Sequence, residues 1–168
     1  MDFLKEAREK LEEEAQRIEV ELRVKLPKEI GAAMSHGDLS ENAEYHAAKE
    51  RQSTLQARMG QIQKRLADLS RIDVSGIPAD RVGLGSEVTV ENLDTGETVR
   101  YTLVIPEVAD GKRNFISIAA PVGRALLNRQ VGDSVTVSIP KGTFELEVRR
   151  FVTISAVSVV SRISLRRR

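Results

Sequence analysis

Two acidic residues near the end of an expected helical hairpin, Asp38 and Glu41, have the side-chain type and spacing to hold a divalent cation. Mg²⁺ in proteins commonly takes one or two carboxylates and keeps its other positions for water and phosphate oxygens. Such a site is incomplete alone and becomes catalytic only beside a phosphodiester that a partner supplies. The sequence therefore suggests an acidic tip that works inside another molecule.

The same two residues also have a simpler structural explanation. If Asp38 begins the second helix, the Asp-x-x-Glu pattern is a capping box, in which side chains accept hydrogen bonds from free backbone amides. Acidic side chains at that end also interact favourably with the helix dipole. From these residues alone, capping is the favoured interpretation and metal binding is the alternative.

Other arrangements that support chemistry are absent from the sequence. His36 and His46 are the only histidines and no cysteine accompanies them, so a zinc site is not indicated. The Gly-Leu-Gly-Ser run at 83–86 precedes an expected strand rather than a helix, which is the wrong context for a dinucleotide-binding loop. No Gly-x-Ser-x-Gly motif is present either. The chain is not expected to be an enzyme by itself.

Two helical stripes of apolar residues are expected to position the tip. The second stripe has heptad spacing, and its members are Leu55, Met59, Ile62, Leu66 and Leu69. The first stripe is more loosely spaced, and its members are Leu4, Leu11, Ile18, Leu22, Leu26 and Ile30. Two such stripes joined by a short turn predict an antiparallel helical hairpin. An arm of about 30 residues would be roughly 45 Å long.

Pro27 interrupts the first stripe. Proline removes a backbone donor and crowds the preceding turn, so we expect a kink or a helix break there. The apolar spacing continues on both sides, which favours one hairpin. Two short helices that meet at Pro27 are the alternative.

The apolar pattern changes to strands after residue 75. β-Branched runs separated by Gly, Pro and Asp predict a small, mostly antiparallel sheet with one short helix at 121–127. We therefore expect an α+β protein with an arm at 1–75, an acidic tip near 36–44, a linker at 76–84, and a sheet domain with a basic C-terminal tail at 85–168.

The composition restricts the possible functions. The 168 residues have a net charge of +1, which argues against tight, purely electrostatic binding to nucleic acid. Aromatic residues are 4%, too few for base stacking to be a major activity. The absence of cysteine excludes disulfides. No apolar run is long enough to span a membrane, so we expect a cytoplasmic protein.

The run from Gly37 to Glu50 resembles the tip motif of the Gre transcript cleavage factors, GreA more than GreB. The second half resembles the C-terminal domain of the same family in order and spacing, at 93–97, 101–104, 120–127, 131–133, and 140–142 with 147–148. The resemblance implies an N-terminal antiparallel coiled coil followed by an FKBP-like antiparallel sheet domain with a short helix.

The resemblance also implies a function. Gre factors bind bacterial RNA polymerase at its secondary channel and stimulate the polymerase's own cleavage of the RNA 3′ end in backtracked complexes, and DNA binding is expected alongside. By position, Asp38 and Glu41 correspond to the acids credited with holding a second Mg²⁺, shared with the polymerase rather than bound tightly by the free protein. RNA contact is expected at Lys49 and Arg51, and a solvent-facing helix surface is the equally favoured alternative for these two residues.

For the sheet domain, the resemblance implies docking near the rim of the polymerase channel, for which Pro121, Gly123 and Arg124 are the candidates. The protein is expected to be a monomer. A channel-binding regulator that inhibits the polymerase without stimulating cleavage is the alternative function. A stand-alone prolyl isomerase is less favoured, because the low aromatic content does not suit the required pocket.

Overall fold

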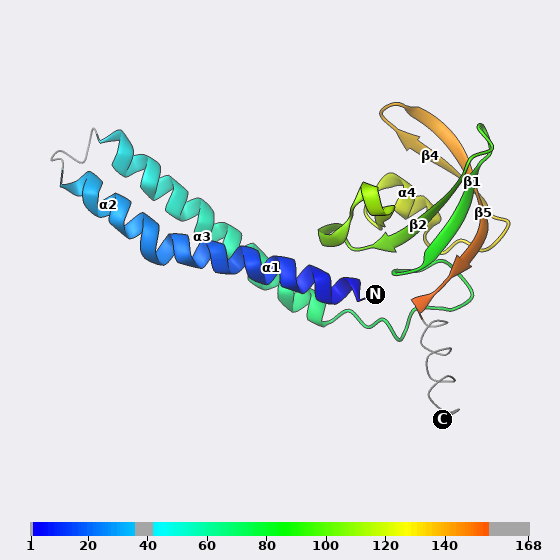
Figure 1. Ribbon diagram of the computed structural model, residues 1–168, viewed down its shortest axis with the longest axis horizontal. Coiled ribbons are helices and arrows are strands. Elements are labelled where there is room, and N and C mark those ends of the chain that lie inside the picture. Colours follow the sequence, from blue (N-terminus) through cyan, green and yellow to red (C-terminus); the bar gives the residue numbers. More distant parts are fainter. Residues whose placement is uncertain (1, 36–41, 155–168) are drawn as a thin grey trace, which may run out of the picture. The chain divides into compact units, whose positions relative to one another are not determined.

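The computed structural model describes residues 2–35 and 42–154, which belong to two compact units (Figure 1). The arm is Arg8–Ile72, and the sheet unit combines the first seven residues with the chain from Asp73 onward. The predicted arm ended at residue 75, three residues after the observed boundary.

The arm is a helical hairpin. The first half of the hairpin consists of α1 (Phe3–Val20), a π-helical segment η1 (Glu21–Lys25) and α2 (Leu26–Met34). The second half is α3 (Ala43–Ser70). Contacts between the two pair Arg8 with Leu69, Glu14 with Arg58, and Glu21 with Arg51. One partner's number rises as the other's falls, so the helices are antiparallel.

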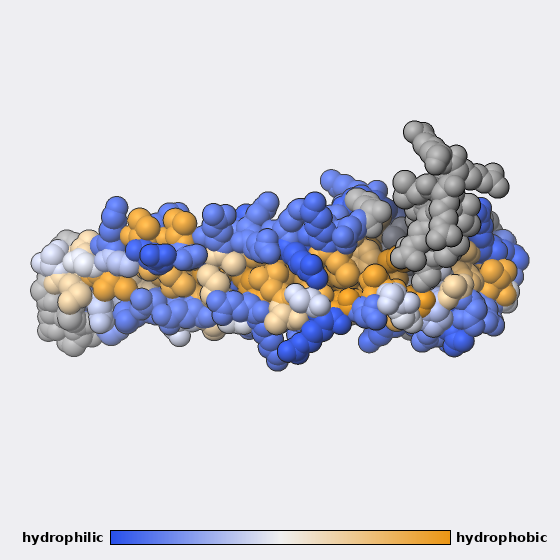
Figure 2. All heavy atoms as spheres, turned by 90° about the horizontal axis from the view of Figure 1, so that it is seen from below, coloured by the Kyte–Doolittle hydropathy of each residue, from blue (hydrophilic) through white to orange (hydrophobic). Residues whose placement is uncertain are grey.

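The predicted heptad positions form the seam of the arm. Ile62 and Leu69 are buried, and Leu55, Met59 and Leu66 are half-buried. The facing positions are Leu11, Ile18 and Leu26, all buried, with Leu22 and Ile30 half-buried. Figure 2 shows hydrophilic residues along both flanks of the arm and hydrophobic residues between them. The apolar periodicity therefore predicted the buried face correctly.

Pro27 does not break the helix. It is the second residue of α2, and the wide turn of η1 comes directly before it, with the Leu26 N–H donating to the Glu21 carbonyl five residues back. A proline ring crowds the carbonyl four residues earlier, which belongs to Arg23 within η1. A π turn is one of the recognised ways in which a helix absorbs such a disturbance. The alternative of two separate helices meeting at Pro27 is therefore wrong.

The sheet unit has a five-stranded sheet in the order β3-β2-β1-β5-β4. Neighbouring strands are antiparallel except for β2 and β3, which are parallel. The expected α+β class is confirmed, with this one parallel pair added. The strands are β1 Glu87–Asn92, β2 Thr98–Val104, β3 Phe115–Ser117, β4 Ser134–Ile139 and β5 Gly142–Val152; the short helices are η2 Pro106–Val108, η3 Gly111–Arg113 and α4 Pro121–Leu126.

The core of the sheet unit lies on one face of this sheet. Alternate residues point to the same face of a strand, so β1 contributes Val88 and Val90 while Thr89 lies between them on the other face. Leu126 of α4 is fully buried in the same cluster. The remaining buried members are Val82, Leu103, Val135, Val137, Leu146 and Val148.

The start of α1 is part of the sheet unit. Arg113 makes a bidentate ion pair with Glu6, at 2.8 and 3.2 Å, and its guanidinium lies 4.1 Å from the centre of the Phe115 ring. Phe3 is buried close to Gly85, which has a positive φ of 78°. These contacts explain why the first seven residues group with the sheet rather than with the arm.

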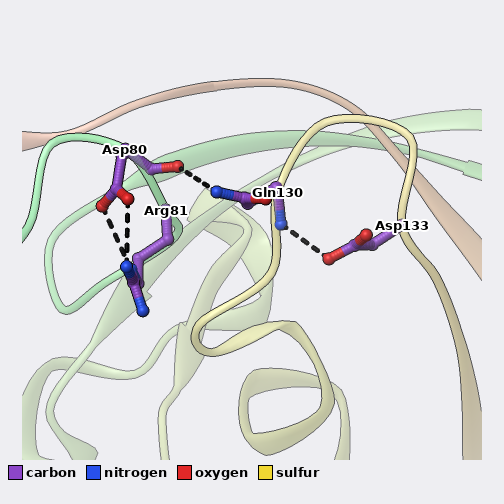
Figure 3. Close-up of polar contacts among 4 residues, drawn as sticks. All are labelled: Asp80, Arg81, Gln130 and Asp133. Atoms are coloured by element: carbon purple, nitrogen blue, oxygen red, sulfur yellow. Dashed lines mark hydrogen bonds and ion pairs between the residues drawn. The ribbon is translucent and has the colours of Figure 1, made fainter.

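The predicted linker at 76–84 has no helix or strand, but its end is firmly attached to the sheet unit. Val82 exchanges backbone hydrogen bonds with the segment after α4, and its side chain is fully buried. Figure 3 shows Asp80 between Arg81 and Gln130: it accepts two hydrogen bonds from Arg81 at 3.0 Å, and its carbonyl accepts one from Gln130. Gln130 in turn donates its backbone N–H to Asp133 at 2.9 Å.

Candidate functional site

Asn42 begins the second helix of the arm. Its backbone is extended, and its side-chain oxygen accepts a hydrogen bond from the Tyr45 N–H at 3.1 Å, which is the geometry of an N-cap. The helix α3 therefore starts at Ala43, four residues later than a cap at Asp38 requires. Asp38 is therefore not the N-cap of α3, so the predicted capping box does not start this helix, and the two acids themselves lie outside the described residues.

The same Asn42 side chain also joins the two helices. Its amide nitrogen donates to the carbonyl of Ala33 in the last turn of α2 at 2.7 Å. The Ala33 carbonyl is one of the last four of its helix and has no partner within a regular helix, so this bond satisfies it. Ser35 ends α2, and its hydroxyl donates to the Ala32 carbonyl at 2.7 Å. Both ends of the intervening segment are therefore fixed.

The segment 36–41, called the tip segment below, carries Asp38 and Glu41 and lies outside the described residues. Its attachment points are nevertheless set by Ser35 and Asn42 at the far end of the hairpin (Figure 1). Carboxylates are the donor type that Mg²⁺ prefers, so the chemistry of these two side chains fits that ion. Among residues 2–35 and 42–154, no group of three or more His, Asp or Glu side chains could hold a metal.

The first turns of α3 combine one buried residue with exposed ones. Ala48 of α3 is buried, as is Ala33 of α2, so small side chains are buried on both helices near this end of the arm. The Tyr45 and His46 rings meet edge to face, with centroids 5.6 Å apart. His46 is exposed on the helix surface.

The two predicted RNA-contact residues differ in their surroundings. Lys49 is exposed and its ammonium donates to Gln52 at 2.9 Å, a neutral partner. Arg51 instead forms an ion pair with Glu21 across the hairpin. The Arg51 hydrogen bond lowers the pKa of the Glu21 carboxyl, and the same bond raises the pKa of Arg51. RNA contact by these residues stays a prediction.

A second ion pair crosses the hairpin between Arg58 and Glu14. It is bidentate, with distances of 2.7 and 2.9 Å. The hydrogen bond from Arg58 lowers the pKa of Glu14. Both cross-hairpin pairs lie on the partly exposed flanks of the seam, where ion pairs fix alignment more than they add stability.

The three predicted docking residues all lie in α4, but only two of them offer a side-chain surface. Pro121 is at the start of the helix and is exposed, as is Arg124. Gly123 is buried, and a Cβ added there would overlap the carbonyl of Ser117. Gly123 therefore lets α4 approach the chain after β3. Docking at α4 stays a prediction.

Sequence reasoning missed the role of Asn42, although a signal was present. Asparagine is among the most favoured N-cap residues, and Glu44 follows it in the first helical turn, as is common for helix starts. The Asp38 pattern competed with this signal. The bond from Asn42 to Ala33 could not be found from sequence, because it depends on how closely the helices approach.

Two family models together cover most of the chain. The model described as "Transcription elongation factor, N-terminal" matches residues 3–70, and "Transcription elongation factor, GreA/GreB, C-term" matches residues 77–151. A helical arm with an acidic tip segment, followed by a small mixed sheet, is thus the architecture of a transcription elongation factor. The chain belongs to the GreA/GreB family.

Two GreA sequences agree with this assignment. Transcription elongation factor GreA of Chlorobaculum tepidum is 45% identical over 140 residues, which are 83% of this chain and 88% of the relative. GreA of Thermodesulfovibrio yellowstonii is 45% identical over 143 residues, 85% of this chain and 90% of the relative. Among solved structures, GreA factor homolog 1 (Gfh1) of Thermus thermophilus is 28% identical over 88% of this chain and 93% of its own, with a TM-score of 0.40.

Within the described residues, the helices lack an apolar stretch of the length needed to traverse a bilayer.

Proposed function

We propose that this elongation factor binds bacterial RNA polymerase, inserts its arm into the secondary channel and stimulates the polymerase's cleavage of backtracked RNA 3′ ends. The observation that carries the proposal is the double hydrogen bonding of Asn42, which anchors the tip segment at the far end of the arm. Because Asn42 caps α3, this helix does not require Asp38 as its N-cap. The protein acts as a monomer in the cytoplasm.

In this proposal, Asp38 and Glu41 hold a Mg²⁺ ion only when the arm is docked. The ion would supply electrostatic stabilisation of the phosphodiester in the transition state and help to activate the attacking water. The two carboxylates supply negative oxygen ligands, and the arm supplies their position. The polymerase supplies the remaining ligands and the substrate, so the protein is not an enzyme by itself.

The other contacts follow from the charges along the molecule. Lys49 and Arg51 are proposed to approach the RNA 3′ segment. Lys49 is better suited, because its hydrogen-bond partner Gln52 is neutral whereas Arg51 is paired with Glu21. The α4 surface with Pro121 and Arg124 is proposed to dock at the channel rim, with Gly123 shaping it from within.

The test uses a stalled, backtracked elongation complex with end-labelled RNA. The wild-type protein is expected to shorten the RNA in a Mg²⁺-dependent reaction. Asp38→Asn and Glu41→Gln are each expected to slow this reaction by about a hundredfold or more, because they remove ligand charge that acts in the transition state. Binding to polymerase, measured by competition, should survive in both variants.

Glu50→Gln is the matched control, because Glu50 is an exposed acid on α3 with no ion pair among the described residues. It is expected to leave cleavage unchanged. Asp38 and Glu41 variants that retain full cleavage contradict the assigned roles. Wild-type protein that binds the polymerase and inhibits it without shortening RNA contradicts the cleavage function itself.

A further inference from the structure

A groove with a volume of about 380 Å³ lies between α2 and α3, one to two helical turns from the tip segment. Every residue that lines it belongs to the arm. Its walls carry charged groups and its floor carries small ones, from Glu29 and Ala32 on α2 and from Glu44, Ala47, Ala48 and Arg51 on α3.

The groove exists because the helices carry small side chains at this level. Farther along the arm, Leu55 and Ile62 fill the seam between the helices. Near the tip segment, the corresponding space is bordered by methyl groups of Ala32, Ala47 and Ala48. The floor is therefore apolar and shallow enough for a partner's side chain to enter from outside.

The charges of the groove are not balanced internally. Arg51 is already paired with Glu21. Glu29 and Glu44 are both exposed, and neither carboxylate has a hydrogen bond or ion pair within residues 2–35 and 42–154. Glu29 acts on Arg51 only through longer-range attraction. An apolar floor thus lies between two carboxylates that form no ion pair with any residue of the described part of the chain.

We propose that this groove receives a lysine or arginine side chain from the wall of the RNA polymerase channel. This inference rests on the proposed function, because it takes the docked arm as given. The aliphatic stem of a basic side chain would cover the alanine methyl groups, and its cationic end would reach Glu29 and Glu44. A phosphate group is disfavoured on the floor of the groove, because Glu29 and Glu44 repel it.

The test compares binding to polymerase that carries no backtracked RNA. The double variant Glu29→Gln/Glu44→Gln is expected to bind about tenfold more weakly than wild type, as expected for loss of partly desolvated charge pairs at an interface. The matched control is Glu12→Gln/Glu50→Gln, which changes the net charge equally on exposed acids outside the groove. It is expected to bind within about twofold of wild type, since exposed rim charges contribute little.

A photo-crosslinking residue at Ala47 identifies the occupant. We expect a crosslink to a polymerase segment that contains a lysine or arginine, and its loss when that residue is replaced by alanine. Equal binding by the groove and control variants overturns the groove proposal, as does a crosslink only to polymerase segments that lack lysine and arginine. If wild-type protein binds polymerase without stimulating cleavage, only the cleavage function fails; if it does not bind, both proposals fail.

Discussion

The arm and the sheet unit bury their side chains in different geometries. In the arm, buried residues such as Leu11, Ile18, Ile62 and Leu69 form a line between two helices, with ion pairs on its flanks. In the sheet unit, nine buried residues form one cluster covered by α4. A substitution in the cluster disturbs packing on all sides of the replaced side chain. A substitution along the line disturbs packing only within one or two helical turns. The four predictions below test this difference.

The largest effect is expected from Leu126→Ala in the sheet unit. Leu126 is fully buried in the cluster, so its loss leaves a cavity and lowers the free energy of unfolding by about 2–5 kcal/mol. Chemical denaturation followed by circular dichroism measures the change. Leu93→Ala is the control, because Leu93 is 41% exposed and its truncation should cost no more than about 0.5 kcal/mol. Equal effects of the two substitutions would show that the cluster is not closely packed.

Glycine-to-alanine substitutions should have opposite signs in the two units. Gly123→Ala places a Cβ against the Ser117 backbone and is expected to destabilise the sheet unit by about 1–3 kcal/mol. Gly60→Ala in α3 meets no atom within 4 Å and is expected to stabilise the arm by about 0.5–1 kcal/mol, because alanine is the better helix former. Thermal melts of the two variants provide the measurement. A stabilised Gly123→Ala variant contradicts the close approach of α4.

Asn42→Ala should loosen the end of the arm without affecting the sheet unit. It removes the cap on the Tyr45 amide and the bond to Ala33, with an expected cost of about 0.5–2 kcal/mol. Hydrogen exchange should accelerate at the start of α3. Asn42→Asp separates the two roles, because it keeps the cap acceptor and loses the donor to Ala33. Exchange rates at residues 43–46 that match wild type in Asn42→Ala would exclude Asn42 as the anchor.

The smallest effect is expected from the pH dependence of the Glu14–Arg58 pair. The hydrogen bond from Arg58 lowers the pKa of Glu14 in the folded arm. The ion pair therefore stabilises the folded arm at pH values above the unfolded pKa of about 4.3. This stabilisation is lost as the pH falls through the lower pKa that Glu14 has in the folded arm. For a partly exposed pair, this is less than about 1 kcal/mol.

Comparing wild type with Glu14→Gln from pH 7 to pH 2.5 measures this contribution. The wild type should be the more stable protein near neutral pH, and the two should converge in acid. A difference that grows as the pH falls would contradict the lowered pKa.

The sequence predicted those features that depend on local periodicity. The heptad positions from Leu55 to Leu69 are the seam, and the β-branched runs after residue 75 form the sheet. The parallel pairing of β2 with β3 was not predicted, because it depends on where the intervening segment returns to the sheet. The expected helix break at Pro27 was not observed, because the effect of a proline depends on whether the neighbouring helical turns can widen.

The sequence predicted which residue types form the candidate site, but not the hydrogen bonds and ion pairs that position the helices beside it. Asp38 and Glu41 stand out by spacing, whereas the choice between Asp38 and Asn42 as helix cap required the observed start of α3. The ion pair of Arg51 with Glu21 joins positions 30 residues apart in the chain. Such a pair requires the register of the two helices to be known, and the register in turn depends on the extra width of η1.

Because of the wide turn of η1, the number of residues in the arm does not by itself determine the direction in which the end of the arm faces. Each residue of a regular α-helix turns the chain by about 100°, so one inserted residue would rotate everything beyond it by that angle. A π turn absorbs a single extra residue locally and leaves the helix beyond it in phase. Arms that differ by one residue can therefore aim their ends identically, if this turn widens or narrows to match.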